Sequence, residues 1–359
     1  MSPLGAEIAR TFGTPAVVID LDVVEANIAR VQAICDAAGV VNRPHVKTHK
    51  SPEIAKLQIA AGARGITCQK LGEAEVMAEA GLDDILISYN LLGEQKLGRL
   101  AALMRRASVT VAADSAVTAD GLATAAARAG RTLDVVVECD TGMKRAGVET
   151  PAEAVALARR IAATPGLGFA GLLLYPPPDR WPATQSFLDA ATAGLRDAGL
   201  ACRIVSTGGS PNLPHLGELK GATEHRPGTY VFNDRMQMAA GVATLADCAL
   251  TVYATVVSRA GAERGIVDAG SKTLTSDPGG GLDGHGLILD LAGARIAALS
   301  EEHGFLDLSA CGERPGVGEV VRIVPNHVCV VVNMVDRLVA VRGGAIVGEI
   351  AVAARGRIG

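Results

Sequence analysis

Residues 43–50 read Arg-Pro-His-Val-Lys-Thr-His-Lys, and this basic segment decides how the rest of the chain is interpreted. Pro44 biases the residue before it towards an extended backbone and does not fit inside a helix. We therefore predict a short strand that ends near Lys47, followed by a helix that begins around Ser51 and Pro52, an N-cap residue and a first-position proline. Burial of a strand-end lysine disfavours its charged form and makes its amine a nucleophile that can form a Schiff base with an aldehyde. The alternative interpretation is a surface loop that happens to be basic.

The chain on both sides of this segment alternates short apolar runs with helical patterns over its first two-thirds. The expected strands are residues 16–20, 44–47, 65–69, 85–88, 108–112, 133–139, 169–174, 203–206 and 223–231. Alanine-rich amphipathic segments lie between most of them, for example residues 23–37, 73–80 and 151–163. This alternation predicts an α/β fold with a parallel sheet, and a closed (β/α)8 TIM-type barrel needs eight strands. We exclude the first candidate and begin the barrel at the Lys47 strand.

After about residue 241 the pattern changes to β-rich runs separated by glycine-rich turns. The runs are residues 251–258, 265–268, 319–325, 328–333, 338–342 and 346–352. They predict a second, mostly antiparallel β-domain, to which the early strand at residues 16–20 can belong. The expected division is a barrel over residues 25–240 and a β-domain formed by residues 1–24 and 241–359.

Composition argues against several classes of function. The net charge of −4 and an aromatic content of 3% favour neither a nucleic-acid partner nor a membrane surface. Seven cysteines are scattered without a Cys-x-x-Cys pair, which favours a reducing compartment. Residues 1–12 contain no apolar signal core, and no apolar run reaches membrane-spanning length. We therefore predict a cytoplasmic protein with a small-molecule substrate.

Two glycine-containing loops lie where barrels usually bind phosphate, after strands seven and eight. Counted from the Lys47 strand, the first loop is residues 207–210, Thr-Gly-Gly-Ser, and the second is residues 226–230, Arg-Pro-Gly-Thr-Tyr. The candidate phosphate-binding residues are Thr207, Gly208, Gly209, Gly228, Thr229 and Tyr230. Each loop alone can be an ordinary turn. Two such loops opposite a strand-end lysine suit an aldehyde cofactor that carries a phosphate, pyridoxal 5′-phosphate.

A second candidate site lies at residues 325–329, which read Pro-Asn-His-Val-Cys. Positions i and i+2 of a strand share one face, so we predict that His327 and Cys329 face one divalent metal. Imidazole and thiolate suit Zn²⁺ best. The alternative is a core histidine beside a buried thiol, since the pair supplies fewer ligands than a metal normally requires.

Three further polar residues follow expected barrel strands. Gln69 follows the second strand and can reach the cofactor. Arg145 follows the fifth and can pair with the ring oxygen of the cofactor, and Tyr175 follows the sixth. Each is equally consistent with an ordinary strand-end or loop residue. No Gly-x-Gly-x-x-Gly or P-loop spacing follows a strand, which argues against nucleotide binding.

Five segments resemble the D-threonine aldolase / D-serine dehydratase family, relatives of alanine racemase with the fold type III architecture. They are residues 14–20, 43–50, 226–230, 268–272 and 325–329. The resemblance covers essentially the whole chain. It implies a barrel that carries pyridoxal 5′-phosphate, a β-domain, a homodimer and a divalent metal (Zn, Mn or Mg) beside the cofactor.

The resemblance also assigns roles to particular residues. It implies that Lys47 is the Schiff-base lysine and that His327 and Cys329 are the metal ligands. It further implies that Thr207, Gly228 and Thr229 contact the phosphate. The predicted activity is that of a lyase for β-hydroxy-D-amino acids, of the D-threonine aldolase type, which yields glycine and an aldehyde.

Two departures from the family pattern keep other activities open. The aldolase branch tends to have Asp where this chain has Cys329 and the dehydratase branch tends to have Cys, whereas residues 332–334 and 353–356 are closer to the aldolase branch. After Tyr175 the family commonly continues with an acidic residue, glycine and histidine, but here three prolines follow, so a possible acid or base is missing. The alternatives are a D-serine or 3-hydroxy-D-aspartate dehydratase, an amino-acid racemase, and a carrier of pyridoxal 5′-phosphate without enzymatic activity.

Overall fold

The structure is a computed structural model that describes residues 2–359 and divides them into two compact units. The barrel unit comprises residues 30–47, 54–228 and 356–359, and the β unit comprises residues 2–29, 48–53 and 229–355. We expected the chain to enter the barrel after residue 24 and to leave it after residue 240. In the structure it enters the barrel unit after residue 29 and leaves it after residue 228. The structure also assigns residues 48–53, directly after Lys47, to the β unit.

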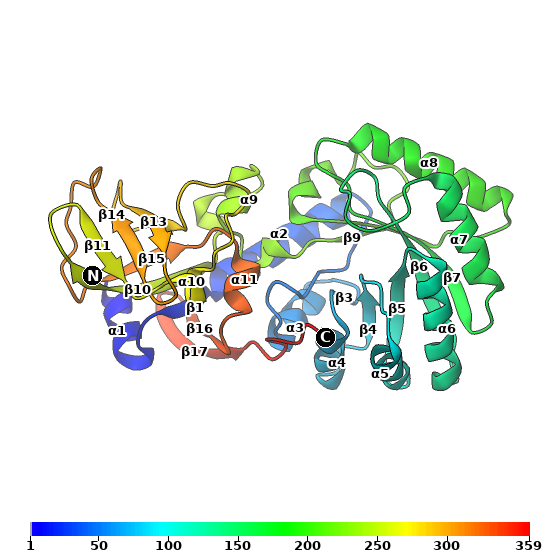
Figure 1. Ribbon diagram of the computed structural model, residues 1–359, viewed down its shortest axis with the longest axis horizontal. Helices are drawn as coiled ribbons and strands as arrows, with labels where there is room; N and C mark the ends of the chain where they lie inside the picture. The colour runs from blue at the N-terminus through cyan, green and yellow to red at the C-terminus, as the bar shows by residue number, and fades with distance from the viewer. Residues whose placement is uncertain (1) are drawn as a thin grey trace. The chain divides into compact units, whose positions relative to one another are not determined.

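The barrel unit is built on a parallel sheet that has eight strands within the described residues, in the order β2-β9-β8-β7-β6-β5-β4-β3 (Figure 1). The strands are β2 (Val41–Asn42), β3 (Ile66–Cys68), β4 (Asp84–Ile87), β5 (Ser108–Ala113), β6 (Leu133–Cys139), β7 (Leu167–Leu174), β8 (Ile204–Gly208) and β9 (Glu224–Arg226). A parallel bridge between His45 and Thr67 joins the continuation of β2 to β3 and closes the sheet. The predicted α/β TIM-type barrel, with the segment before Lys47 as its first strand, is confirmed.

Helices connect the barrel strands. They are α3 (Pro52–Ala60), α4 (Leu71–Glu79), α5 (Glu94–Met104), α6 (Ala116–Ala129), α7 (Pro151–Ala163) and α8 (Trp181–Asp197). The start of α7 is encoded locally, because the Thr150 hydroxyl accepts a hydrogen bond from the Glu153 N–H and the Glu153 carboxylate accepts one from the Thr150 N–H. This helix has the bounds that its periodicity predicts, and α3 begins at Pro52 as predicted.

Alternate residues of the barrel strands belong to two different apolar clusters. Ile85 and Ile87 of β4 pack in the large cluster that includes helix residues, whereas Leu86 between them packs with Val136 and Leu173 in a smaller one. Successive side chains of a strand point to opposite faces. The large cluster is therefore the layer between sheet and helices, and the small one fills the barrel interior.

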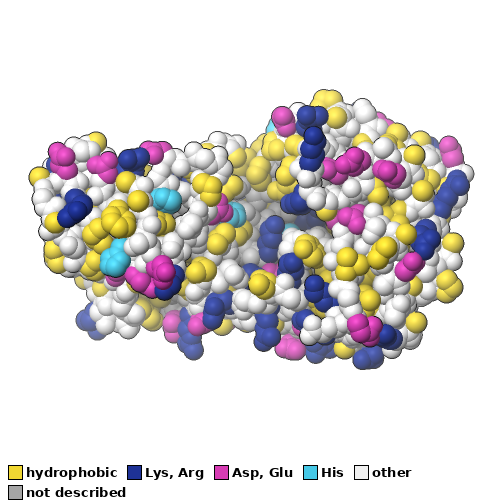
Figure 2. All heavy atoms as spheres, viewed as in Figure 1, with side chains coloured by type: hydrophobic (Ala, Val, Ile, Leu, Met, Phe, Trp, Pro, Cys, Tyr) yellow, Lys and Arg dark blue, Asp and Glu magenta, His cyan; other side chains and the backbone are white. Residues whose placement is uncertain are grey.

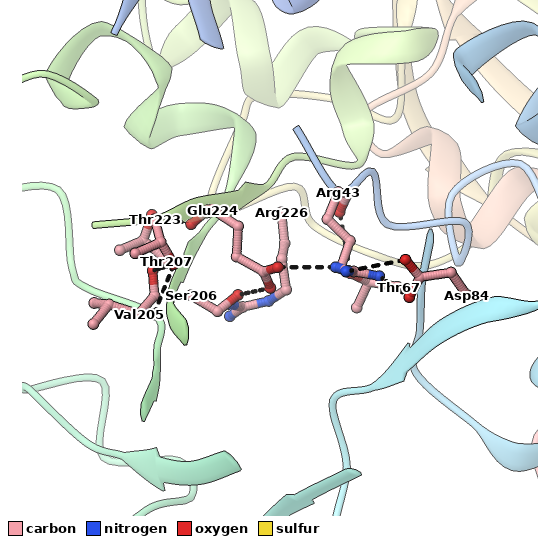
Figure 3. Close-up of polar contacts among 9 residues, drawn as sticks. All are labelled: Arg43, Thr67, Asp84, Val205, Ser206, Thr207, Thr223, Glu224 and Arg226. Carbon is pink, nitrogen blue, oxygen red and sulfur yellow. Dashed lines mark hydrogen bonds and ion pairs between the residues drawn. The ribbon is translucent and has the colours of Figure 1, made fainter. Parts of the chain in front are cut away.

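A buried ion-pair network links several barrel strands (Figure 3). Arg43 Nε donates to Glu224 at 2.9 Å and Arg43 Nη1 donates to Asp84 at 2.8 Å. Ser206 Oγ donates to the other oxygen of Glu224 at 2.6 Å, and Arg226 donates to Ser206. Arg43 and Glu224 are buried, so removing either one leaves an uncompensated charge at a cost of about 3–5 kcal/mol. The basic segment that opens the barrel is thus fixed by charge pairing to β4 and β9.

The β unit contains a mixed sheet. Its strands are β1 (Ala16–Asp20), β10 (Leu250–Arg259), β11 (Arg264–Val267), β12 (Leu287–Ile288), β13 (Arg295–Leu299), β14 (Gly304–Asp307), β15 (Val320–Val324), β16 (Arg337–Arg342) and β17 (Ala345–Ala351). Strand β1 pairs antiparallel with β10 and parallel with β16. The other pairings in this sheet of the described chain are antiparallel. The early strand that we excluded from the barrel therefore belongs to the β-domain, as expected.

Short helices complete the β unit, and one long helix belongs to both units. The helices are α1 (Pro3–Phe12), α9 (Arg235–Ala239), α10 (Ser271–Leu274) and α11 (Val328–Val332), and the long one is α2 (Leu21–Ala37). In the part of the chain that the structure describes, no helix is both long and apolar enough to cross a membrane. The cysteines in residues 2–359 are free thiols.

Three predicted strands are wrong in bounds or type. Where we predicted a strand at residues 44–47, the structure has strand β2 at Val41–Asn42 and a single bridge at His45. The strand does not continue through Pro44 because proline has no N–H to donate. Lys47 lies in a turn. The strand predicted at residues 223–231 ends at Arg226, before Pro227. The strand predicted at residues 328–333 is helix α11.

Candidate functional site

A cavity of about 670 Å³ lies beside Lys47 in the barrel unit. It is lined by Lys47, Gln69, Ser88, Tyr89, Asn90, Leu92, Lys96, Glu138, Arg145 and Ala146. These residues lie at or after the C-terminal ends of β2, β3, β4 and β6, the end of a barrel on which active sites are built. The structure therefore brings three predicted site residues, Lys47, Gln69 and Arg145, to one cavity.

A hydrogen-bonded histidine fixes the groups around Lys47. The Lys47 N–H donates to His45 Nδ1 at 3.4 Å, so the proton of a neutral His45 ring lies on Nε2. That nitrogen is 3.2 Å from Gln69 Oε1 and 3.3 Å from Ser88 Oγ. Gln69 Nε2 in turn donates to the Ser88 carbonyl at 3.1 Å. These contacts fix the orientation of the Gln69 amide, with Oε1 towards His45 and Nε2 towards Ser88, so the second N–H of Nε2 is the group that Gln69 can offer to a ligand.

Tyr175 follows β7 and lies against the first glycine loop. A Cβ atom on Gly209 would lie 2.8 Å from Tyr175 Oη, and Gly209 has a φ of +100°, so only glycine fits there. A Cβ atom on Gly208 would lie 3.1 Å from Arg226 Nη2. The Arg145 guanidinium carbon is 4.9 Å from the centre of the Tyr175 ring. Tyr175 thus connects the glycine loop to the wall of the cavity.

The Thr207 hydroxyl is engaged within the protein. His225 Nε2 lies 3.1 Å from the Gly209 carbonyl oxygen, which can only accept, so His225 Nδ1 is the acceptor for the Thr207 hydroxyl at 2.8 Å. Burial, with Arg226 nearby, lowers the pKa of His225 to about 3, so the ring is neutral. The Thr207 O–H therefore donates within the protein.

The second glycine loop meets the first. The Gly228 N–H donates to Ser210 Oγ at 3.3 Å, which joins the loops after β8 and β9. Thr229 and Tyr230 belong to the β unit. The cluster described in the barrel unit therefore contains Gly228 but not these two predicted residues.

These barrel residues fit pyridoxal 5′-phosphate. The cavity volume is in the range of about 300–1,000 Å³ that small-molecule sites occupy. Lys47, Lys96 and Arg145 outnumber Glu138 in its lining, which suits an anionic ligand. The close contact of Gly209 with Tyr175 shows that the loop leaves no room for a side chain where a phosphate would approach the backbone.

His327 and Cys329 lie at the start of α11. His327 is the N-cap residue with an extended backbone, and Cys329 lies in the first helical turn. Valines on both sides of Cys329 favour a strand by propensity. The helix forms because the Asp234 carboxylate accepts a hydrogen bond from the Val328 N–H at 3.0 Å and so caps it from a distant part of the chain.

Asp234 also orients the histidine. The His327 Nδ1–H lies 3.0 Å from the fully buried Asp234 Oδ2, which leaves Nε2 as the nitrogen that can bind a metal. Cys329 Sγ is 3.2 Å from Thr48 Oγ1 and 3.8 Å from Thr229 Oγ1. Thr48 and Thr229 directly follow Lys47 and Gly228 in the chain.

The pair fits a divalent metal by its charges. Burial opposes protonation of His327, but hydrogen bonds with Asp234 and Cys329 outweigh it and raise the pKa of His327 to about 10. The protonated His327 ring is thus a cation held between the Asp234 carboxylate and the Cys329 thiol. A metal ion bound to His327 would replace one proton of this ring. Within residues 2–359 no set of three or more His, Cys, Asp or Glu side chains is arranged around one metal position. A metal held here would have His327 and Cys329 as its candidate protein ligands.

The sequence interpretation missed several residues of these clusters. His45, Ser88 and Glu138 belong to the cavity or its hydrogen bonds, and Asp234 belongs to the histidine pair. Glu138 had a local signal, an acidic residue at the end of the apolar run at residues 135–137. Asp234 had only the signal of a helix N-cap, because it accepts from the Gln237 N–H at the start of α9, whereas its contacts with His327 and Val328 are more than 90 residues away.

A lysine-bearing cavity at the C-terminal end of a parallel barrel, in a chain with a second β unit, defines the alanine racemase-like class of proteins. The family model "Alanine racemase, N-terminal domain" matches residues 19–236, and "Putative serine dehydratase domain" matches residues 249–341. A D-threonine aldolase from Arthrobacter sp. is 37% identical over 98% of this chain and 95% of its own. The chain belongs to the D-threonine aldolase / D-serine dehydratase family.

Solved structures agree with this assignment. The crystal structure of D-threonine aldolase from Filomicrobium marinum has a TM-score of 0.89 at 36% identity and covers 96% of both chains. A D-threo-3-hydroxyaspartate dehydratase variant, solved in a metal-free form, has a TM-score of 0.87 at 32% identity over 98% of this chain and 99% of its own.

Proposed function

We propose that this chain is a pyridoxal 5′-phosphate- and metal-dependent lyase of the D-threonine aldolase type, which cleaves β-hydroxy-D-amino acids to glycine and an aldehyde. The observation that carries the proposal is the cavity that Lys47, Gln69 and Arg145 line at the C-terminal end of the barrel. The relatives named D-threonine aldolase, at 37% and 36% identity, support the same reaction.

In this proposal the barrel residues hold the cofactor. Lys47 binds it covalently and gives it up to the amino group of the substrate. Bound pyridoxal 5′-phosphate supplies an electron sink for the charge left at Cα when a bond to that carbon breaks. Arg145 and the free N–H of Gln69 donate to oxygen on the cofactor ring. The loops at residues 207–210 and 226–230 receive its phosphate.

The β unit supplies the metal ligands. His327 through Nε2 and Cys329 through its thiolate hold a divalent ion, with Zn²⁺ the best match to this ligand set. A divalent ion held by these two residues would supply a Lewis acid that lowers the pKa of a substrate hydroxyl. Asp234 keeps His327 in the tautomer that exposes Nε2. The implied homodimer is part of the proposal and is checked by the mass of the protein in solution.

Dehydration is the second candidate activity. Cys329 occupies a position at which the resemblance associates cysteine with the dehydratase branch, and a dehydratase is among the structural relatives. The same residues serve either outcome: aldol cleavage breaks Cα–Cβ, whereas dehydration needs Lys47 to remove the α-proton. The products separate the two.

The test is a product assay on protein loaded with pyridoxal 5′-phosphate and Zn²⁺ or Mn²⁺. D-threonine, D-serine and 3-hydroxy-D-aspartate are the substrates, and Lys47→Ala is the control. Glycine with an aldehyde identifies an aldolase, and ammonia with a keto acid identifies a dehydratase. If the only product is the L-enantiomer and it still forms after chelation, the lyase proposal fails in favour of a racemase.

A further inference from the structure

Glu138 is a buried carboxylate that the proposed function does not use. It lies at the C-terminal end of β6, is 7% exposed and lines the same cavity as Lys47. Within residues 2–359 no group donates a hydrogen bond to its carboxylate. Its carboxylate oxygens are not sealed inside the protein but face the cavity, where a cation can pair with them once a ligand excludes water.

Arg145 is the matching cation on the wall of the same cavity. Its described side-chain contact is the face of the Tyr175 ring, and no carboxylate of residues 2–359 lies within ion-pair distance of it. Its loop returns to Glu138, because the Val148 N–H donates to the Glu138 carbonyl at 2.9 Å. The other charges that face Glu138 are Arg226 of β9, which attracts it, and Asp114 and Asp140, which repel it.

We propose that Glu138 is a positioning residue: its carboxylate pairs with the Arg145 guanidinium when the cofactor occupies the cavity, and it thereby holds Arg145 against the ring oxygen of the cofactor. The proposal rests on the proposed function, because that function supplies the cofactor. An arginine on a loop needs such an anchor to keep its fork of donors in one orientation. A bound ligand also excludes water from the cavity, which strengthens the attraction between the two charges.

In the cofactor-free protein, by contrast, the charge of Glu138 is expected to lower the stability of the fold. Burial raises the pKa of Glu138 above its ordinary value despite Arg226 and Arg145. A carboxyl group with a raised pKa stabilises the fold only at low pH, and its charge opposes folding at neutral pH. Replacing Glu138 by Gln should therefore leave the melting temperature of the cofactor-free protein unchanged or raise it. A residue with a merely structural role would lower it.

The experiment is a double-mutant cycle read by cofactor affinity, without substrate. Glu138→Gln should weaken the binding of pyridoxal 5′-phosphate about tenfold, the value of one charge-assisted hydrogen bond. Arg145→Gln should weaken it at least as much, and the double variant should match Arg145→Gln within about twofold. Both single variants should shift the visible absorbance of the bound cofactor in the same direction. Glu138→Asp should restore part of the affinity.

Asp120→Asn is the matched control, since Asp120 is an exposed carboxylate of α6 paired with Arg160. Like Glu138→Gln, Asp120→Asn removes one negative charge, but it should leave the affinity for pyridoxal 5′-phosphate unchanged. Effects of Glu138→Gln and Arg145→Gln that multiply in the double variant would show that Glu138 acts on the ligand directly and would overturn the inference. Unchanged affinity in Glu138→Gln would overturn it as well. A wild-type protein that bound no pyridoxal 5′-phosphate would overturn the proposed function and this inference together.

Discussion

At the scale of single residues, Lys47 carries the chemistry that the basic segment predicts. Lys47→Ala should abolish the visible absorbance of the bound cofactor and the lyase activity, because Lys47 follows β2 at the C-terminal end of the barrel, whereas Lys96, another lysine of the cavity lining, lies on helix α5. The fold should persist, since the buried pairing of the segment runs through Arg43. Absorbance spectra and turnover measured with a thermal melt check this. A variant that keeps a cofactor band removable by borohydride would transfer the role to another lysine, with Lys96 the candidate in the cavity.

Asp234 gives a second prediction at this scale. Asp234 Oδ2 accepts from both the Val328 N–H and the His327 Nδ1–H, and Oδ1 accepts from the Gln237 N–H, so Asp234→Asn must place an amide NH2 group, which cannot accept, at one of these two positions. An NH2 group at the Oδ2 position loses the bonds to Val328 and His327, and an NH2 group at the Oδ1 position faces the Gln237 N–H, so either placement weakens the hold on the His327 ring. Metal affinity should fall about 10–100-fold, as is typical for the loss of such a partner. Titration with Zn²⁺ against a competing chelator measures it.

The control for that titration is Asp283→Asn, because Asp283 is exposed and pairs with Arg295. Its metal affinity should equal that of the wild type. If Asp234→Asn binds Zn²⁺ as tightly as this control does, His327 does not bind the metal through Nε2.

Residues that we predicted from the sequence are marked by their immediate neighbours in the chain, whereas the residues that we missed depend on partners that are distant in the chain. Lys47 and Gly209 stand out because a strand end and a tight turn restrict which residue types can occupy them. The local signals of Asp234, a helix N-cap, and of Glu138, an acidic residue at the end of an apolar run, do not identify the distant residues that the folded chain brings to them. His327 and Cys329 were paired for the wrong reason. Two residues of a strand would share a face, but here His327 is the N-cap residue and Cys329 lies in the first turn of helix α11.

At the scale of elements, the barrel strands were predictable because a strand buried on both faces is a continuous apolar run. The run at residues 135–137 and the three leucines at residues 172–174 are examples. The prediction failed where tertiary contacts override propensity. Helix α11 is made of β-favouring valines and depends on Asp234. Strands β13 and β14 were not predicted, since both are short and include exposed positions without clear alternation.

Strands β8 and β9 lead to a prediction about pH. The fold holds His225 neutral and lowers its pKa from 6.5 to about 3, so its contribution to stability is complete above pH 6.5 and is lost as the pH falls towards 3. The free energy of unfolding should drop by about 1.4 kcal/mol per pH unit for this one proton. His225→Gln keeps groups that can bond Gly209 and Thr207 but does not titrate, so it should remove that slope. Urea unfolding at pH 7 and pH 5 measures it.

The matched control for this comparison is His215→Gln, because His215 is exposed beside Glu218. It should show the same pH dependence as the wild type. A wild-type protein and His225→Gln with equal slopes would mean that His225 does not titrate against the fold.

At the scale of the whole molecule, the chain passes between units at points that the sequence did not reveal. A division into consecutive blocks cannot predict that residues 48–53 belong to the β unit, because that assignment depends on contacts and not on composition. The consequence is chemical. Lys47 and Gly228 belong to the barrel unit, and the residues that follow them, Thr48 and Thr229, contact Cys329 in the β unit.

In the proposed function the barrel unit holds the cofactor and the β unit holds the metal. We therefore predict that cofactor and metal can be removed separately. The cavity residues Lys47, Gln69 and Arg145 are not metal ligands, and His327 and Cys329 do not belong to the barrel unit. Exhaustive chelation should therefore stop turnover while the absorbance of the bound cofactor persists, and Zn²⁺ or Mn²⁺ should restore activity. Conversely, Lys47→Ala should lose the cofactor but still bind one equivalent of metal. Cofactor absorbance that disappears on chelation would show that the metal holds the cofactor. Full turnover by a protein without stoichiometric metal would refute the lyase mechanism proposed above, in which the metal is the group that lowers the pKa of the β-hydroxyl.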